Sequence, residues 1–409
     1  MEEWKEYNIG NLCSKVCSGG TPSSKHSEYY DGNIPWLNTK EINFNRIYST
    51  EKYITEEGLN NSSAKWIEEN SVIVAMYGAT AGKTAIAKIP LTTNQACCNL
   101  TINSSLADYN FVYYHLCNKF TELASLANGG AQQNLNAQII KEFPILLPSL
   151  NEQQKIVSIL KSLDDKIEVN RKINENLEQQ AQALFKSGFV DFEPFKNGEF
   201  VESELGMIPK GWRVEVLGDV CKCILGGTPS RNKEEYWNGN IAWINSGEVN
   251  EFRIVKPSEY ITEEGLKHSA TKLLPKKTTV LAITGATLGQ VSLLEIDSCA
   301  NQSVIGVLEN DNIPYEFLYP LINVKITELC SHMTGGAQQH INKNNVEQLN
   351  IVLPSENLMT DYKEKTKSIY SQITNCCFES RRLAELRDTL LPKLMSGELK
   401  VNEVEMYNQ

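Results

Sequence analysis

Residues 19–43, GGTPSSKHSEYYDGNIPWLNTKEIN, return 207 positions later as GGTPSRNKEEYWNGNIAWINSGEVN, residues 226–250. The two strings are identical at 14 of 25 positions. The same offset relates YITEEGL at 53 to YITEEGL at 260, and an offset of 206 relates GGAQQN at 129 to GGAQQH at 335. The chain therefore contains two copies of one unit, and its fold is a duplicated one.

Each copy has the same internal order. Apolar β-like runs such as SVIVAMY (71–77) and TTVLAIT (278–284) precede Gly-rich turns, and FPILLPS or LNIVLPS closes the globular part as a strand ended by Pro. A polar, helix-forming stretch follows in both copies. We therefore predict a first globular domain at 1–150, a helix region with linker at 151–200, a second domain at 201–355, a second helix region at 356–400 and a tail at 401–409.

The two polar stretches have the spacing of a coiled coil, with seam residues alternating by four and three. The first seam comprises Ile156, Leu160, Leu163, Ile167, Asn170, Asn174 and Leu177, and continues through Ala181 and Leu184. The second includes Ile369, Ile373, Cys376, Ser380, Leu383 and Leu390. Both seams become polar or small near the middle, so we expect antiparallel pairing that aligns the two centres and fixes their register. The alternative is two unrelated amphipathic helices, each packed on its own domain.

Composition restricts the class of protein. The formal net charge is −11, whereas a stand-alone nucleic-acid binder is usually basic, so a partner would have to complete any positive surface. No apolar run is long enough to span a bilayer, and the acidic N-terminus lacks a signal region, so we expect a cytoplasmic protein without a membrane partner. The eleven cysteines and five histidines show no paired metal-ligand spacing, so we expect reduced thiols and no metal.

Two further stretches carry a family resemblance. They are LPSLNEQQKIVSILKSLDDKIEVNRKINENLEQQAQALFKS, which starts at 147, and LAELRDTLLPKLMSGEL, which starts at 383. Together with the order of domains, they resemble the specificity subunit of type I restriction–modification enzymes over nearly the whole chain. The resemblance implies an α+β fold, in which two repeated mixed α/β target-recognition domains are separated by two long antiparallel coiled-coil helices with pseudo-two-fold symmetry.

The resemblance also implies a function in defence against foreign DNA. Each recognition domain would read one half of a bipartite double-stranded DNA target, and the helices would dock two modification (methyltransferase) subunits and, through them, restriction/translocase subunits. This chain would be non-catalytic. S-adenosylmethionine, ATP and Mg would be bound by the partner subunits, with no cofactor on this chain.

One stretch, AMYGATAGKTAIA (75–87), looks like a phosphate-binding loop. A P-loop has four residues between its first Gly and the Gly-Lys-Thr, whereas Gly78 and Gly82 enclose three. The second copy has Gln290 in place of Lys83, which a nucleotide site would not be expected to tolerate. We therefore predict a turn between two strands. No Asn-Pro-Pro-Tyr or Gly-x-Gly-x-x-Gly motif supports the remaining enzyme alternatives, a P-loop NTPase or a single-chain methyltransferase, and a repeat adaptor without DNA is the other alternative.

Positions that differ between the copies, inside loops that otherwise match, are candidates for reading bases. Positions shared by both copies are more typical of scaffold or DNA-backbone contact, and we expect Trp36 and Trp243 in the core. The polar side chains of the Gln-rich loops and of the Gly-rich turns complete the candidate set. The DNA-binding candidates are Ser24, Lys25, His26, Tyr30, Lys40, Lys83, Gln133, Asn134, Arg231, Asn232, Lys233, Trp237, Gln290, Gln339 and His340. For any one of them, neutral surface drift is the alternative.

Overall fold

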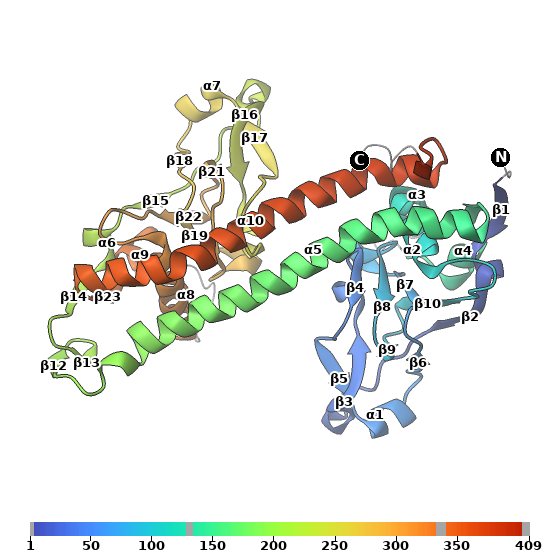
Figure 1. The fold of residues 1–409 in the computed structure, drawn as a ribbon, viewed down its shortest axis with the longest axis horizontal. Helices are drawn as coiled ribbons and strands as arrows, with labels where there is room; N and C mark the ends of the chain where they lie inside the picture. Colours follow the sequence, from blue (N-terminus) through green and yellow to red (C-terminus); the bar gives the residue numbers. More distant parts are fainter. Residues whose placement is uncertain (1–3, 128–133, 333–340, 403–409) are drawn as a thin grey trace. The chain divides into compact units, whose positions relative to one another are not determined.

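The computed structural model describes residues 4–127, 134–332 and 341–402. The chain divides into two compact units, one of Met1–Asp165 with Leu383–Gln409 and one of Lys166–Arg382. We call them unit 1 and unit 2. Each combines small β-sheets with helices (Figure 1), and the two long helices contribute residues to both units. The expected α+β fold, with two repeated mixed domains and long helices, is confirmed.

Unit 1 holds two main sheets. Its strands are β1 (Lys5–Asn8), β2 (Cys13–Ser18), β3 (Tyr30–Leu37), β4 (Asn45–Ile47), β5 (Lys52–Ile54), β6 (Trp66–Ile67), β7 (Val72–Ala75), β8 (Thr84–Ala87), β9 (Leu91–Thr93), β10 (Cys97–Ile102) and β11 (Pro144–Leu147). Its short helices are α1 (Glu56–Asn60), α2 (Tyr109–Asn118), α3 (Phe120–Ser125) and α4 (Ala137–Glu142), with 3-10 turns η1 (Ile9–Leu12), η2 (Ser27–Tyr29), η3 (Thr39–Glu41) and η4 (Gly78–Thr80). The sheet orders are β2-β10-β7-β8-β4 and β5-β3-β9-β6, and β1 pairs with β11.

Unit 2 repeats this plan. Its strands are β12 (Phe200–Ser203), β13 (Gly206–Pro209), β14 (Arg213–Val216), β15 (Cys223–Leu225), β16 (Trp237–Ile244), β17 (Glu259–Ile261), β18 (Leu273–Leu274), β19 (Thr279–Ala282), β20 (Val291–Leu293), β21 (Ser298–Ala300), β22 (Val304–Val307) and β23 (Asn350–Leu353). Its helical segments are η5 (Lys186–Val190), η6 (Glu193–Phe195), α6 (Leu217–Val220), η7 (Glu234–Tyr236), η8 (Ser246–Asn250), α7 (Glu263–Lys267), η9 (Gly285–Thr287), α8 (Tyr315–His332) and α9 (Lys343–Glu347). The orders β15-β22-β19-β20 and β17-β16-β21-β18 match those of unit 1 except that β4 has no counterpart strand, its place being taken by an isolated bridge between Ile254 and Leu294. The hairpin β12-β13 lies in the segment that joins the first helix region to the second copy.

The cores form where the repeated sequence is apolar. All four residues of β7 and all four of β19 are buried, as expected for strands covered on both faces. Trp36 and Trp243 are 4% and 2% exposed, which confirms their predicted core position. Each indole Nε1 donates a hydrogen bond to the backbone oxygen of Gly20 or Gly227, at 2.9 and 3.1 Å. The shared Gly-Gly and Trp positions therefore hold one frame in both units.

The long helices are α5 (Leu150–Phe185) and α10 (Glu356–Met395). Within unit 2, Asn170 Nδ2 donates to Glu379 Oε2 at 2.8 Å and Asn174 Nδ2 donates to Cys377 Sγ at 3.3 Å. Residue numbers rise along α5 as they fall along α10, so the helices pair antiparallel there, as predicted. Within unit 1, Arg387 of α10 bonds Asp164 of α5 at 2.7 Å.

The buried face of α5 follows the proposed seam up to Asn174 and then shifts by one residue. Ile156, Leu160, Asn170, Asn174, Ile373 and Cys376 are buried, whereas Leu163, Ile167, Leu177, Ile369, Ser380, Leu383 and Leu390 are partly exposed. Beyond Asn174 the buried residues are Glu178, Ala181 and Phe185, and Leu184 is 45% exposed. A straight helix has 3.6 residues per turn, so its inner face drifts away from a strict 3.5-residue repeat.

Backbone packing gives a first prediction. A Cβ placed on Gly20 would lie 2.3 Å from the backbone nitrogen of Ala64, whereas one on Gly188 would meet no atom within 4 Å. We expect Gly20→Ala to lower the free energy of unfolding by about 1–3 kcal/mol through overpacking. Gly188→Ala should be neutral or slightly stabilising. Urea unfolding of the full chain measures both, and equal midpoints for the two variants would contradict the close-packing interpretation.

A second prediction concerns acid stability. His115 lies in the core of unit 1 and its Nε2 donates to the backbone oxygen of Pro144 at 2.9 Å. Burial lowers its pKa from 6.5 to about 4. Between pH 6.5 and 4, His115 is therefore protonated in the unfolded chain but not in the folded chain. The free energy of unfolding falls by up to about 3 kcal/mol as the pH decreases from 6.5 to 4.

In His115→Gln this pH-dependent loss should be absent. We expect the gap in unfolding free energy between wild type and variant to shrink as the pH falls from 6.5 to 4, measured by urea titration at several pH values. His268→Gln provides the control for the same substitution outside the core, because the side chain of His268 is 60% exposed. A constant gap for His115→Gln would show that His115 titrates normally.

Candidate nucleic-acid interface

The loop between β2 and β3 presents three of the candidate residues of unit 1 to solvent. Ser24, Lys25 and His26 are all exposed. His26 stacks on Tyr29 with ring centroids 4.8 Å apart, and its Nδ1 lies 2.8 Å from Glu28 Oε1. The pKa of Glu28 is lowered by hydrogen bonds from its own backbone and from His26. The loop thus combines a free lysine amine with a fixed imidazole ring.

The matching loop of unit 2 has different chemistry. Arg231 donates two hydrogen bonds to Glu259, at 2.6 and 2.7 Å, and its guanidinium lies 3.7 Å from the ring centre of Trp237. Asn232 is exposed, and Lys233 Nζ donates to Tyr236 Oη at 2.8 Å. The arginine is therefore held flat against an aromatic ring, with its charge matched by Glu259.

Tyr30 and Trp237 occupy the same place in the two copies and make the same kind of contact. Tyr30 Oη donates to the backbone oxygen of Pro22 at 2.6 Å, and Trp237 Nε1 donates to that of Ser230 at 3.1 Å. Trp237 is only 9% exposed. Both rings hold their loop in shape, and a role in reading bases stays a prediction for them.

The glycine-rich stretch is a turn between antiparallel strands in both units, as predicted. Strand β7 pairs with β8, and β19 pairs with β20. Gly78 and Gly82 have φ values of 71° and 87°, and their counterparts Gly285 and Gly289 have 75° and 83°, a backbone region that glycine enters without strain. A phosphate-binding loop leads into a helix whose N-terminus faces the phosphate, and here a strand follows instead.

This turn carries the second group of candidates. Lys83 Nζ donates to Asn43 Oδ1 at 2.8 Å, and its counterpart Gln290 is exposed. Lys40, in η3, pairs with Glu51 at 2.7 Å. The structure therefore brings Lys83 next to the segment that follows η3.

The segment before α4 also meets the turn. Leu135 N donates to the backbone oxygen of Met76 at 2.8 Å, and the exposed Asn134 forms an isolated β-bridge with Tyr77. In unit 2 Ile341 N donates to the oxygen of Ile283. Asn136 and Asn342 cap α4 and α9, since their side chains accept hydrogen bonds from the first turns of these helices. Gln133, Gln339 and His340 lie outside the described residues.

Sequence reasoning missed the charged contacts between each recognition domain and the long helices. Arg46 bonds Asp165 of α5, and Arg253 bonds Glu178 of α5. The two arginines are related by the 207-residue offset of the repeat. That identity was the available signal, but it does not single out the arginines, because Glu41, Glu56 and Glu57 also have identical counterparts in the second copy.

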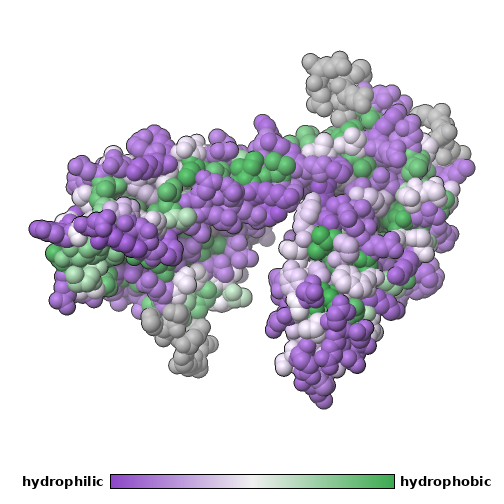
Figure 2. All heavy atoms as spheres, turned by 60° about the horizontal axis from the view of Figure 1, so that its bottom comes forward, coloured by the Kyte–Doolittle hydropathy of each residue, from purple (hydrophilic) through white to green (hydrophobic). Residues whose placement is uncertain are grey.

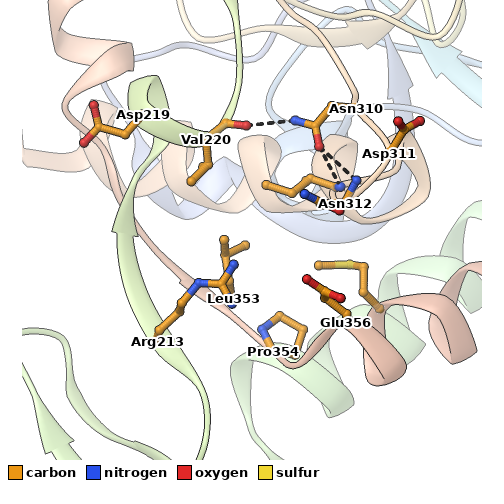
Figure 3. A pocket seen from close by; sticks show the side chains of 11 residues that line it. Arg213, Asp219, Val220, Asn310, Asp311, Asn312, Leu353, Pro354 and Glu356 are labelled. Atoms are coloured by element: carbon orange, nitrogen blue, oxygen red, sulfur yellow. Dashed lines mark hydrogen bonds between the residues drawn. The ribbon is translucent and has the colours of Figure 1, made fainter.

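Among the pockets near the starts of the long helices, two lie at equivalent places of the repeat and differ in their lining. The pocket beside α10, about 380 Å³, is lined by Arg213, Asp219, Asp311 and Glu356 (Figure 3), and Asn310 shapes its rim by bonding the backbones of Val220, Asn312 and Ile313. The pocket beside the start of α5, about 460 Å³, is lined mainly by Tyr7, Leu106, Leu147 and Leu150. The α10 pocket thus has four charged lining residues, whereas Lys5 is the charged residue that lines the α5 pocket.

The surface and the thiols are consistent with a binding protein. Hydrophilic side chains cover most of the face in Figure 2. Burial raises the pKa of Cys13 to about 11 and of Cys98 and Cys221 to about 12, so these thiols stay protonated and are poor nucleophiles. In the part of the chain that the structure describes, no three His, Cys, Asp or Glu side chains are grouped to hold a metal. No helix within the described ranges has the length and apolarity needed to cross a membrane.

Comparisons with known proteins identify the family. Residues 1–179 and 209–382 match the model of the type I restriction modification DNA specificity domain. The chain is 31% identical to the type I restriction enzyme MjaIX specificity subunit of Methanocaldococcus jannaschii, over 98% of each chain. It is 24% identical to the HindI specificity subunit of Haemophilus influenzae, over 98% of this chain and all of the relative.

A solved structure shares the fold. The type I restriction–modification S subunit from M. genitalium superposes with a TM-score of 0.53 at 18% identity, over 96% of both chains. The duplicated recognition domain, the paired long helices and the family match over most of the sequence agree. The chain belongs to the type I restriction–modification DNA specificity family, and it is a specificity subunit.

Proposed function

We propose that each unit reads one half of a bipartite double-stranded DNA target. The observation that supports this most directly is that one frame carries two different sets of exposed loop residues. Shared glycine and tryptophan positions hold the frame. Ser24 and Lys25 of unit 1 correspond in the repeat to Arg231 and Asn232 of unit 2. A duplicated scaffold with unequal loops suits two related but unequal half-sites.

The specificity role is that of a recognition subunit without catalysis. We further propose that α5 and α10 dock two modification subunits, and through them the restriction/translocase subunits. S-adenosylmethionine, ATP and Mg would then be bound by those partners and not by this chain. The net charge of −11 favours this division, because a complete positive path for DNA needs a basic partner. The assembly would act in the cytoplasm, where foreign DNA arrives.

The half-sites provide a direct test. In cells that carry the complete system, methylome sequencing should reveal one bipartite motif whose halves share some bases in inverted orientation and differ at others. Deletion of this chain should abolish the motif. Two halves without any shared inverted base would contradict the common frame, and a continuous motif would contradict the two-domain proposal itself.

The Gly-rich turn gives a test of DNA contact. We propose that Lys83, whose Nζ donates to Asn43 Oδ1, also contacts a DNA phosphate. Gln290 provides no charge at the equivalent place. With the chain assembled with its modification subunits, Lys83→Gln should weaken DNA binding at every sequence. It should also reduce the slope of log K against log salt by about 0.9, since one fewer counterion is released. Fluorescence titrations at four or more salt concentrations measure that slope.

Two further variants sharpen this experiment. Gln290→Lys should increase the slope by a similar amount if the second turn also approaches the DNA backbone. Lys196→Gln is the matched control, because Lys196 is 59% exposed directly after η6 and is not one of the candidate residues. An unchanged slope in Lys83→Gln would remove the turn from the DNA interface, whereas a changed methylation motif would mean that Lys83 reads a base instead.

A further inference from the structure

Each recognition domain is tied to the long helices by one arginine at the same position of the repeat. Arg46 lies in β4, and Arg253 follows η8 at the offset of 207. Their side chains are 11% and 0% exposed. The preceding residue differs, Asn45 in one copy and Phe252 in the other, whereas the following residue is isoleucine in both. Both copies therefore have an arginine with a buried side chain at this position.

In unit 1 the arginine belongs to a cluster centred on Asp164 of α5. Arg46 Nη1 lies 2.5 Å from Asp165 Oδ1, and its Nη2 lies 3.8 Å from Asp164 Oδ2. Tyr114 of α2 donates to Asp164 at 2.6 Å, and Arg387 of α10 bonds the same carboxylate at 2.7 Å. One carboxylate thus connects a sheet edge, a domain helix and both long helices.

In unit 2 the same arginine uses a different acid. Arg253 Nη2 donates to Glu178 of α5 at 2.6 Å, and its Nη1 lies 3.2 Å from Tyr319 Oη. The guanidinium carbon lies 4.3 Å from the ring centre of Phe252. Position 370, which matches Asp164 at the offset of 206, is a tyrosine. What both copies preserve is the link from this arginine to the helix pair, and not a particular acidic position.

Stability alone does not explain such links. Removing two charges from water offsets most of their attraction, and well-packed apolar residues often stabilise a fold as well or better. A hydrogen bond between a guanidinium and a carboxylate, however, forms only over a narrow range of angles. A rotation outside that range breaks the bond and leaves a buried charge without its partner. We call the contacts of Arg46 with Asp164 and Asp165, and of Arg253 with Glu178, the two clamps. The clamps therefore restrict the orientation of each domain on the helices more than they raise the free energy of unfolding.

We propose that Arg46 and Arg253 are positioning residues that set which spacing between the two half-sites the protein accepts. This rests on the proposed function, in which the two domains read separate half-sites. Because α5 and α10 contribute residues to both units, looseness at either clamp becomes looseness in where one domain meets the DNA. The bases that each domain reads depend on its loops and are left unchanged.

The test uses the full chain assembled with its modification subunits and a DNA library in which both half-sites are fixed and the spacer length varies. Wild type should methylate one length strongly. In Arg46→Met the preference for that length over its neighbours should fall by about tenfold, within the range measured for coupled contacts. Arg46→Lys, which keeps the charge but lacks the planar guanidinium, should show a preference between those of wild type and Arg46→Met.

A second variant addresses folding in unit 2. Arg253→Met alone would leave Glu178 buried without its partner, so Arg253→Met is combined with Glu178→Leu. The double variant should unfold at a temperature equal to or above that of wild type and still show the relaxed spacer profile. Arg171→Met is the control, since Arg171 is 49% exposed and pairs only along its own helix with Glu168 and Glu175. Its spacer profile should match wild type.

The outcomes are separable. A uniform loss of methylation at every length, with the preference unchanged, would overturn the positioning role and leave a structural one. Relaxed spacing with unchanged half-site bases supports the proposal. If wild type itself shows no preferred spacer, the bipartite function fails, independently of the arginines.

Discussion

The carboxylate of Asp164 accepts hydrogen bonds from Tyr114 of α2 and Arg387 of α10, and Arg46 of β4 lies beside it. A group with this many partners, 13% exposed, fixes the angle at which the sheet of unit 1 meets the helices. Apolar packing alone would tolerate small rotations, because the hydrophobic effect is non-directional. Directional charged bonds remove that freedom, and Arg253 with Glu178 does the same in unit 2.

The frame that these clamps hold is built to be copied. Gly20 and Gly227 approach neighbouring backbone too closely for any side chain, and the nearby indole of Trp36 or Trp243 bonds their carbonyl oxygens. Such positions have no room to diverge. The loop that runs from this frame into β3 or β16 is exposed, and there the side chains of the two copies differ. Unit 1 has the exposed Lys25, whereas in unit 2 the guanidinium of Arg231 contacts Trp237 and Glu259. Residues that hold the frame and residues that differ between the copies therefore lie directly next to each other in the sequence.

The sequence predicted much of the fold because the relevant signals are local or repeated. The repeat showed the duplication, the four-three spacing showed the helices, and the mismatch between Lys83 and Gln290 excluded a nucleotide loop. The two clamps were not predicted, because no local sequence pattern links Arg46 to Asp165, which lies 119 positions away. The shift of the buried face of α5 from Leu177 to Glu178 was not predicted, because a strict seven-residue repeat does not account for the 3.6 residues per turn of a straight helix. The hydrogen bond from Trp237 Nε1, at the start of β16, to the backbone oxygen of Ser230 could not be predicted, because no local pattern specifies which backbone oxygen a tryptophan will contact.

The middle of the helix pair shows the same preference for specificity over stability. Asn170 is fully buried and Asn174 is 6% exposed, and the Oδ1 atom of each has no hydrogen-bond partner among the described residues. Each orphaned oxygen costs free energy that leucine at the same place would not. In return, the Nδ2 atoms donate hydrogen bonds to Glu379 and Cys377. A polar residue at a seam position favours one register at a cost in stability, whereas an all-apolar seam packs in more than one register. The two buried asparagines therefore favour the observed alignment of α5 and α10 over its neighbours.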